Sequence, residues 1–250
     1  SSGRAASMAP QQPMCFRLRQ SRLGVGILHA FAVASKDGPM SAVLSRVTCI
    51  EISECQAVAW PDLKEILKCL PSITTLVLKG NPWLDDDIVE QICIKYNKAL
   101  RYVDLENTLV TDNSLHHMAK KCPHLQSLIV NHCRNIGNKG FAELRKVSLR
   151  SLMLSHSTEC DDASVDVVLS NSGNLHKLRF INCPKLTDKT IIALFESAVS
   201  WGSKRNERSA NLVSLEIAGN PSITHHSLLY LSTAVPKIGM LDLSDCPAVR

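Results

Sequence analysis

Residues 125–133 read LQSLIVNHC, and this pattern recurs through most of the chain. It places aliphatic residues at Leu125, Leu128 and Val130 and a small polar residue at Cys133. The pattern starts at Val47, Ile73, Leu100, Leu125, Leu149, Leu175, Leu212 and Ile238. These starts lie 26, 27, 25, 24, 26, 37 and 26 residues apart. A fixed period of roughly 20 to 50 residues indicates a stack of similar structural units.

Each unit predicts one strand followed by one helix. The alternation of Leu128 and Val130 with other residues sends their side chains to one face of a short strand. In the unit before it, Leu115, Met118 and Ala119 stand at helical spacing. Thr and Asp at residues 111–112 are typical of a helix start, and the proline at residue 123 stops the helix. One unit cannot bury its apolar face alone, so the units must stack.

Two segments of the chain resemble a known family of repeats. Residues 110–125 (VTDNSLHHMAKKCPHL) and 182–188 (NCPKLTD) are similar to the cysteine-containing leucine-rich repeat, which is typical of F-box/leucine-rich-repeat substrate receptors of ubiquitin ligases and of related adaptors. The resemblance implies an α/β solenoid of about eight repeats over residues 47–250, with the last repeat truncated after its strand. In such a right-handed horseshoe, parallel strands line the concave face and helices cover the convex face. Residues 1–46 show no recognisable F-box.

The charge is unevenly distributed along the chain. The net charge is +5, and residues 1–46 hold six basic residues and one acid, so the whole excess lies there. Residues 47–250 hold 22 basic and 22 acidic residues, which argues against nucleic-acid binding by the repeats. No apolar run reaches the roughly 18 residues of a membrane-spanning helix, which argues against membrane insertion.

The segment 1–46 is a basic leader or linker with three interpretations. It can be a linker that ends in a cap helix covering the first repeat, a mitochondrial transit peptide, or a secretory signal. The wide interval before Leu212 predicts an insertion at residues 200–209, which we interpret as a solvated surface loop.

Cysteines and acids fit the repeat better than they fit a metal or catalytic site. Cys55, Cys133, Cys183 and Cys246 share one repeat position with Asn81 and Asn220, which predicts buried thiols and a reducing, intracellular compartment, cytoplasmic or nuclear. None of the cysteines or histidines shows the paired spacing of a zinc site, so we expect no metal and no cofactor. The acids at 85–87 and 161–162 precede apolar helices, where they favour helix capping. No catalytic motif is present, and the chain is not predicted to be an enzyme.

The candidate site is a protein-binding patch on the concave face. The position between the two strand leucines is Ile129 and Met153 in the central repeats, flanked by charged residues. Exposed apolar residues ringed by charges are typical of protein recognition. The alternative is a set of tolerated surface residues. The candidate residues are Tyr102, Asp104, Ile129, Arg150, Met153, His156, Lys177, Arg179 and Glu216.

These features predict a non-catalytic module that recognises a protein partner. The resemblance implies a substrate adaptor of a ubiquitin ligase. The alternatives are a mitochondrial leucine-rich-repeat assembly factor, whose partners would be mitochondrial complex subunits, and a RanGAP-like GTPase activator. A basic leader would suit the mitochondrial alternative, for which the compartment would be the mitochondrion.

Overall fold

Nine parallel strands form one sheet in which spatial order follows chain order. The computed structural model describes residues 14–19, 39–56, 58, 60–169, 174–196, 211–234 and 238–249. Every neighbouring pair of strands is parallel and hydrogen-bonded. The strands are β1 (Met14–Arg19), β2 (Val47–Ser53), β3 (Thr75–Val77), β4 (Tyr102–Asp104), β5 (Ser127–Ile129), β6 (Ser151–Ser155), β7 (Lys177–Ile181), β8 (Ser214–Glu216) and β9 (Met240–Asp242).

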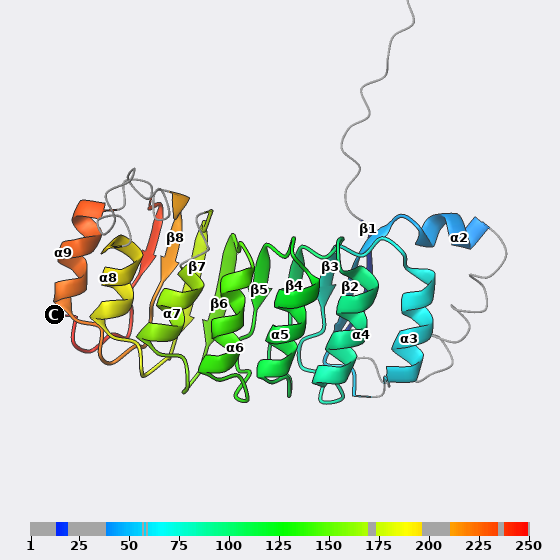
Figure 1. Ribbon diagram of the computed structural model, residues 1–250, viewed down its shortest axis with the longest axis horizontal. Helices are drawn as coiled ribbons and strands as arrows, with labels where there is room; N and C mark the ends of the chain where they lie inside the picture. The colour runs from blue at the N-terminus through cyan, green and yellow to red at the C-terminus, as the bar shows by residue number, and fades with distance from the viewer. Residues whose placement is uncertain are drawn as a thin grey trace, which may run out of the picture.

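The helices form a single layer on one side of this sheet (Figure 1). They are α2 (Pro39–Leu44), α3 (Trp60–Cys69), α4 (Asp86–Tyr96), α5 (Asp112–Lys121), α6 (Asn138–Glu143), α7 (Asp162–Leu169), α8 (Asp188–Glu196) and α9 (His225–Ala234), with the 3-10 turn η1 (Leu144–Lys146) after α6. This alternation of strand and helix is a leucine-rich-repeat α/β solenoid, as the period predicted. The other face of the sheet is the concave face of the solenoid.

The structure confirms a strand at each of the eight sequence motifs and adds a ninth. The added strand, β1, comes from the leader, where Arg17 pairs with Glu51 and Leu18 with Ile52 across β1 and β2. Phe16 and Leu18 pack against the core while Arg17 faces away from it. The alternation of apolar and charged residues that is typical of a strand was therefore present in this part of the sequence. The division of the chain at residues 46 and 47 stays a prediction. Residues 1–13, residues 20–38 and the insertion at 200–209 lie outside the described residues.

The core is built from side chains that occupy the same position in successive repeats. One row includes Ile50, Leu76, Val103, Leu128, Leu152, Leu178 and Leu215, all of them buried and in register across the sheet. From the convex side, Leu115, Met118 and Ala119 of α5 are buried, as their spacing predicted. Each such side chain stabilises the fold by about 1.5–3 kcal/mol before conformational entropy is subtracted. The stack therefore supplies the core that one unit lacks.

The turn after each strand has a left-handed residue at one repeat position. Six non-glycine residues have positive φ there, namely Glu54, Asn107, His132, His156, Asn182 and Asp245. Gly80 and Gly219 take the same conformation, with φ of 68° each. This conformation turns the chain out of the strand so that the next residue points into the core. The turn places His156, a candidate site residue, at the end of β6 rather than on the sheet.

No helix in the described part of the chain is long and apolar enough to cross a membrane.

Candidate functional site

The outward-facing side chains of the sheet form rows that run across all nine strands. The central row is Arg17, Glu51, Val77, Asp104, Ile129, Met153, Arg179, Glu216 and Asp242, and its members are in register from strand to strand. A second row contains Tyr102, Ser127, Ser151 and Lys177. Adjacent parallel strands lie about 4.8 Å apart, so neighbours within a row touch one another. Seven of the nine predicted site residues fall in these two rows.

Near both ends of the row, the charges neutralise one another. Arg17 donates a hydrogen bond to Glu51 at 2.5 Å, and Arg19 makes a second bond to the same carboxylate. Burial alone would raise the pKa of Glu51, but the hydrogen bonds from both arginines outweigh it and hold this pKa below its usual value. Glu216 forms ion pairs with Arg179 at 2.9 Å and Lys177 at 3.4 Å. The predicted residues Lys177, Arg179 and Glu216 therefore already have partners of opposite charge within the protein.

Asp104, on strand β4, lacks an ion pair of this kind among the described residues. Its residue surface is only 7% exposed, and no cation lies within 4.0 Å of it among the described residues. It accepts a hydrogen bond from the backbone N–H of Glu106 at 3.0 Å. Burial raises the pKa of Asp104 and the nearby charge of Glu106 adds to the rise, while the backbone hydrogen bond from Glu106 and the more distant charge of Lys79 oppose it. A buried carboxylate with no cation in contact is energetically costly, and such groups are candidates for functional sites.

Two further polar side chains lie near Asp104, Tyr102 on β4 and Glu106 in the turn after it. Burial raises the pKa of Tyr102 to about 12, and the carboxylate of Asp104 contributes to this shift. The Tyr102 hydroxyl therefore stays neutral and can donate a hydrogen bond at physiological pH. Glu106 accepts a hydrogen bond from the side-chain amide of Asn131 at 3.0 Å, a residue that the sequence analysis did not single out.

The strip beside Asp104 is neutral. It consists of the half-buried residues Ser127, Ser151 and Met153 together with Ile129. The expectation that Ile129 is an exposed centre is wrong, because its surface is only 7% exposed. Asp104 and Met153 flank it in the same row and cover most of its surface. Met153 therefore carries the accessible apolar surface of this strip.

Two predicted residues lie at opposite ends of β6. Arg150 precedes the strand and is exposed. Its backbone N–H donates to the carbonyl of Gln126 in the preceding repeat, and the N–H of Gln126 donates in turn to the carbonyl of Arg101. His156 follows the strand, where its ring stacks on His132 at a centroid distance of 4.0 Å. Burial lowers the pKa of His156, and the neighbouring His132 adds to the effect. The structure thus brings Tyr102, Asp104, Ile129 and Met153 together but separates Arg150 and His156 from each other.

Most of the cysteines are buried. All ten cysteines are present as thiols, and Cys55, Cys133, Cys183 and Cys246 are buried at their shared repeat position. In the described ranges, no group of three His, Cys, Asp or Glu side chains has the geometry to hold a metal ion.

The chain was compared with known proteins. No protein-family profile matches it. One similar protein is "Putative RNA-binding protein EEED8.10" of Caenorhabditis elegans, which is 22% identical over 202 residues, or 73% of this chain. The chain spans only 27% of the length of that relative.

Two solved structures are similar to this chain. The crystal structure of Rad7 and Elc1 complex in yeast has a TM-score of 0.47 and 18% identity, and covers 89% of this chain and 67% of that chain. The internalin C2 structure from Listeria monocytogenes has a TM-score of 0.49 and 13% identity, and covers 85% and 91%, respectively. The fold itself is established by the parallel, in-register sheet and its helical layer.

Proposed function

We propose that this protein is a non-catalytic module that binds a protein partner on its concave face, centred on β4 to β6. The observation that carries the proposal is the buried Asp104 carboxylate. It has no cation within 4.0 Å among the described residues, and it adjoins a neutral strip with accessible apolar surface at Met153. Folding alone gives no reason to keep a charge at this cost, whereas a bound partner can neutralise it. The hydroxyl of Tyr102 offers a further hydrogen bond beside it.

The pattern of charges defines what the partner presents. Glu51 and Glu216 already have arginine partners. Among the described residues of the row, Asp104 and Asp242 form no ion pair, and of these two only Asp104 is buried, with Glu106 beside it. We expect the partner to place a Lys or Arg side chain at this point and an aliphatic side chain over Met153. A charged pair formed in such a desolvated place contributes strongly to specificity.

The substitution Asp104→Asn tests this proposal because binding and stability should change in opposite directions. Loss of the charge should weaken partner binding roughly tenfold to a hundredfold. The same change should stabilise the unbound protein at neutral pH. The pKa of Asp104 is raised in the folded state. Between the ordinary pKa and this raised pKa, the folded state therefore binds more protons than the unfolded state. The free energy of unfolding of the wild type falls as pH rises through this range and stays lower above it.

The stability gain of Asp104→Asn should therefore appear at pH 7 and vanish well below about pH 4, where an aspartate is protonated in both states. Urea unfolding followed by circular dichroism at both pH values measures this gain. A variant that binds normally, or that loses binding only because it is destabilised at pH 7, contradicts the proposal.

Affinity purification with quantitative mass spectrometry supplies the binding measurement. The wild-type chain, Asp104→Asn and Met153→Glu are compared with Asn113→Glu, an exposed position on the convex side. Partners of the concave face should be lost from Asp104→Asn and Met153→Glu and kept by Asn113→Glu. Ubiquitin-ligase subunits among them would support a substrate-adaptor role, and respiratory-complex subunits would support a mitochondrial assembly role.

A further inference from the structure

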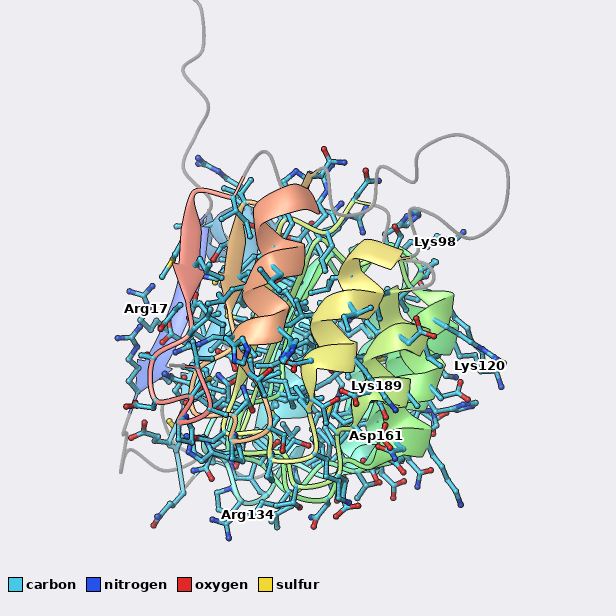
Figure 2. The ribbon with its side chains drawn as sticks, turned by 90° about the vertical axis from the view of Figure 1, so that its left-hand side faces the viewer. Arg17, Lys98, Lys120, Arg134, Asp161 and Lys189 are labelled. Atoms are coloured by element: carbon cyan, nitrogen blue, oxygen red, sulfur yellow. The ribbon has the colours of Figure 1, made fainter. Side chains whose placement is uncertain are left out.

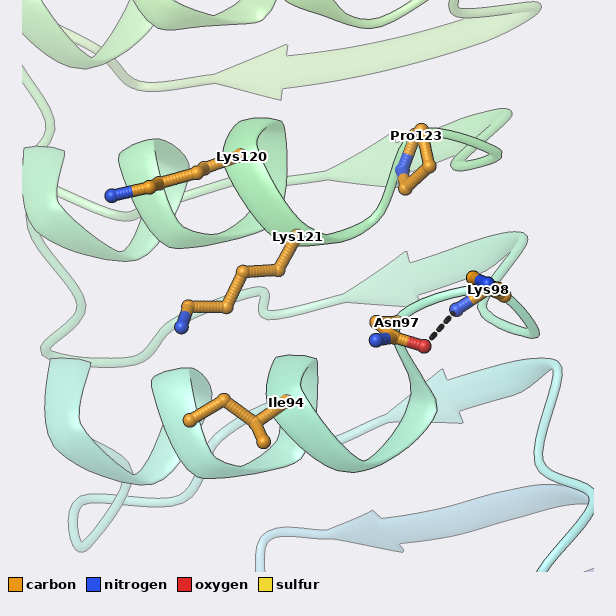
Figure 3. Close-up of a pocket in the computed structure, with 6 residues that line it drawn as sticks. All are labelled: Ile94, Asn97, Lys98, Lys120, Lys121 and Pro123. Atoms are coloured by element: carbon orange, nitrogen blue, oxygen red, sulfur yellow. Dashed lines mark hydrogen bonds between the residues drawn. The ribbon is translucent and has the colours of Figure 1, made fainter.

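A pocket of about 410 Å³ lies on the convex side, between the last turns of α4 and α5. It is lined by Ile94, Asn97, Lys98, Lys120, Lys121 and Pro123. Figure 3 shows Lys121 lying between the two helices, with Ile94 on α4 and Lys120 on α5. Ile94, in the last turn of α4, is 53% exposed, although isoleucine is among the residues most often buried. The pocket thus combines an apolar contact point with cationic walls.

Two of the three lysines have no carboxylate partner. Lys121 lies 3.3 Å from the carboxylate of Glu90 on α4. Lys98 and Lys120 are exposed, and neither forms an ion pair with any acid in the part of the chain that the structure describes. Lysines at helix C-termini complement the helix dipole, which explains Lys120 and Lys121 in part. The dipole does not explain an exposed Ile94 beside them, nor Lys98, which lies beyond the end of α4.

The pocket continues into a longer cationic surface, which we call the basic edge. It runs along the side of the solenoid where helices end and strands begin, and comprises Lys98, Arg101, Lys120, Lys121, Arg145, Lys146 and Arg150. The sequence contains no acid at residues 91–103, 113–142 or 144–158. Two lysines of the edge are paired, Lys121 with Glu90 and Lys146 with Glu143, whereas Lys98, Arg101, Lys120, Arg145 and Arg150 form no ion pair with a described acid. The acids of these repeats lie mainly at the other edge, where helices begin. Figure 2 shows Lys98 and Lys120 beside the helices and Asp161 toward that opposite edge.

We propose that the pocket and the basic edge bind an acidic, extended segment of a partner protein, in which glutamates or aspartates flank one aliphatic side chain. The aliphatic group would contact Ile94 and Pro123, and the carboxylates would pair with Lys98 and Lys120. A nucleic acid fits less well, because single strands are held by stacking on aromatic side chains and none lines this pocket. The pocket lies between α4 and α5, away from Asp104 and Met153 on the sheet, so the inference goes beyond the proposed function.

Fluorescence polarisation with the full chain tests the inference. The probe is a short fluorescein-labelled peptide of glutamates with two central leucines. It is compared with a peptide in which lysines replace the glutamates, a peptide in which serines replace the leucines, and a labelled oligouridine of similar length. The acidic peptide with leucines should bind most tightly, and its affinity should fall as salt is raised.

Variants locate the binding site. The double variant Lys98→Glu/Lys120→Glu should weaken binding of the acidic peptide roughly tenfold or more, and Ile94→Ser should weaken it severalfold without changing the salt dependence. The matched control is Lys139→Glu/Lys189→Glu, which reverses two exposed lysines on helices at the opposite edge. Met153→Glu on the concave face should leave peptide binding unchanged, so this test is independent of the proposed function.

Three outcomes would overturn the inference. The first is equal loss of binding in the control and in the pocket variants, which would indicate attraction by net charge alone. The second is tighter binding of the oligouridine than of the acidic peptide. The third is unchanged peptide binding in Lys98→Glu/Lys120→Glu when circular dichroism shows that this variant is folded.

Discussion

Single residues at one repeat position hold neighbouring repeats together through hydrogen bonds to the backbone. The side chain of Asn81 is fully buried, accepts from the N–H of Cys55 at 2.9 Å and donates to the carbonyls of Ile52 and Leu78. Asn220 bonds in the same way to Cys183 and Phe180. Where a cysteine occupies the position, as at Cys133, its thiol donates to one carbonyl, that of Leu105 at 3.1 Å. The asparagines therefore bridge repeats more completely than the cysteines do.

Asn81→Ala should lower the free energy of unfolding by about 2–4 kcal/mol, because it leaves a buried N–H and two buried carbonyls without partners. Urea unfolding followed by circular dichroism measures the loss. Asn113→Ala, at an exposed position on α5, is the control and should change stability little. A loss at Asn81 no larger than at Asn113 would show that water or a shifted backbone satisfies these groups.

At the same scale, the sequence pattern located the outward row but misjudged its exposure. Alternation placed Ile129 and Asp104 on the concave face, where they lie. It could not reveal that each is 7% exposed, because the cover comes from neighbours about 25 residues away in sequence. Arg17 and Arg19 were likewise missed as partners of Glu51, because that pairing requires β1 to join the sheet.

At the scale of elements, an aspartate in the first turn of several helices accepts hydrogen bonds from the start of the next helix. The sequence analysis predicted that the acids at 85–87 cap their own helix, and Asp85 does so by accepting from the N–H of Ile88 at 2.9 Å. Asp86 instead accepts from Thr111 and Ser114 of the following repeat. Asp162 and Asp188 make the same kind of contact with the next threonine along the chain. A threonine one repeat after each such aspartate was the available signal.

Asp86→Ala should lower the free energy of unfolding at pH 7 by about 1–3 kcal/mol, since donors at the start of α5 lose their acceptor. Burial alone would raise the pKa of Asp86, but hydrogen bonds from Ser114 and Thr111 outweigh it and lower this pKa. The stabilisation is therefore present above the ordinary pKa of aspartate, about 4, and is lost as pH falls through the lower folded value.

The difference between wild type and Asp86→Ala should shrink as pH is lowered below about 4. Thermal unfolding at a series of pH values measures it. Asp166→Asn, an exposed acid on α7, provides the control and should show little difference at any pH. A difference for Asp86→Ala that does not depend on pH would contradict the assignment of this carboxylate as the charged cap.

At the scale of the whole molecule, the sheet begins in the leader. Cys15 on β1 lies opposite Cys49 on β2, with 2.6 Å between the two sulfur atoms. Both thiols are half-buried, and burial together with the neighbouring thiol raises the pKa of Cys49 to about 12. Paired cysteines at this register offer a direct chemical test of where β1 lies.

Treatment with oxidised glutathione should join Cys15 to Cys49. The two thiols lose their protons and two electrons to form one disulfide, while the glutathione disulfide is reduced to two glutathione molecules. Non-reducing peptide mapping by mass spectrometry should find this link ahead of any link to the buried Cys160 or Cys183. Failure to find the Cys15–Cys49 link, or a link from Cys15 to another cysteine, would contradict the pairing of β1 with β2.

The distribution of charge over the surface also depends on the whole fold. Residues 47–250 carry equal numbers of basic and acidic residues, which argued against nucleic-acid binding by the repeats. The helix-to-strand order gathers seven lysines and arginines of the central repeats at one edge and most aspartates of these repeats at the other. A neutral chain thus has a basic edge, which only the fold reveals.

The sequence by itself determined the solenoid, because its period of about 26 residues fixes which side chains must be buried and each repeat contacts mainly its neighbours. It also determined which residues of each strand face outward, since alternation along a strand is a local property. The tertiary structure alone decided that Asp104 is buried without a cation, that Glu51 and Glu216 are neutralised, and that Lys98 and Lys120 meet at one pocket. These features depend on distances between residues of different repeats, which the order of residues along the chain does not contain.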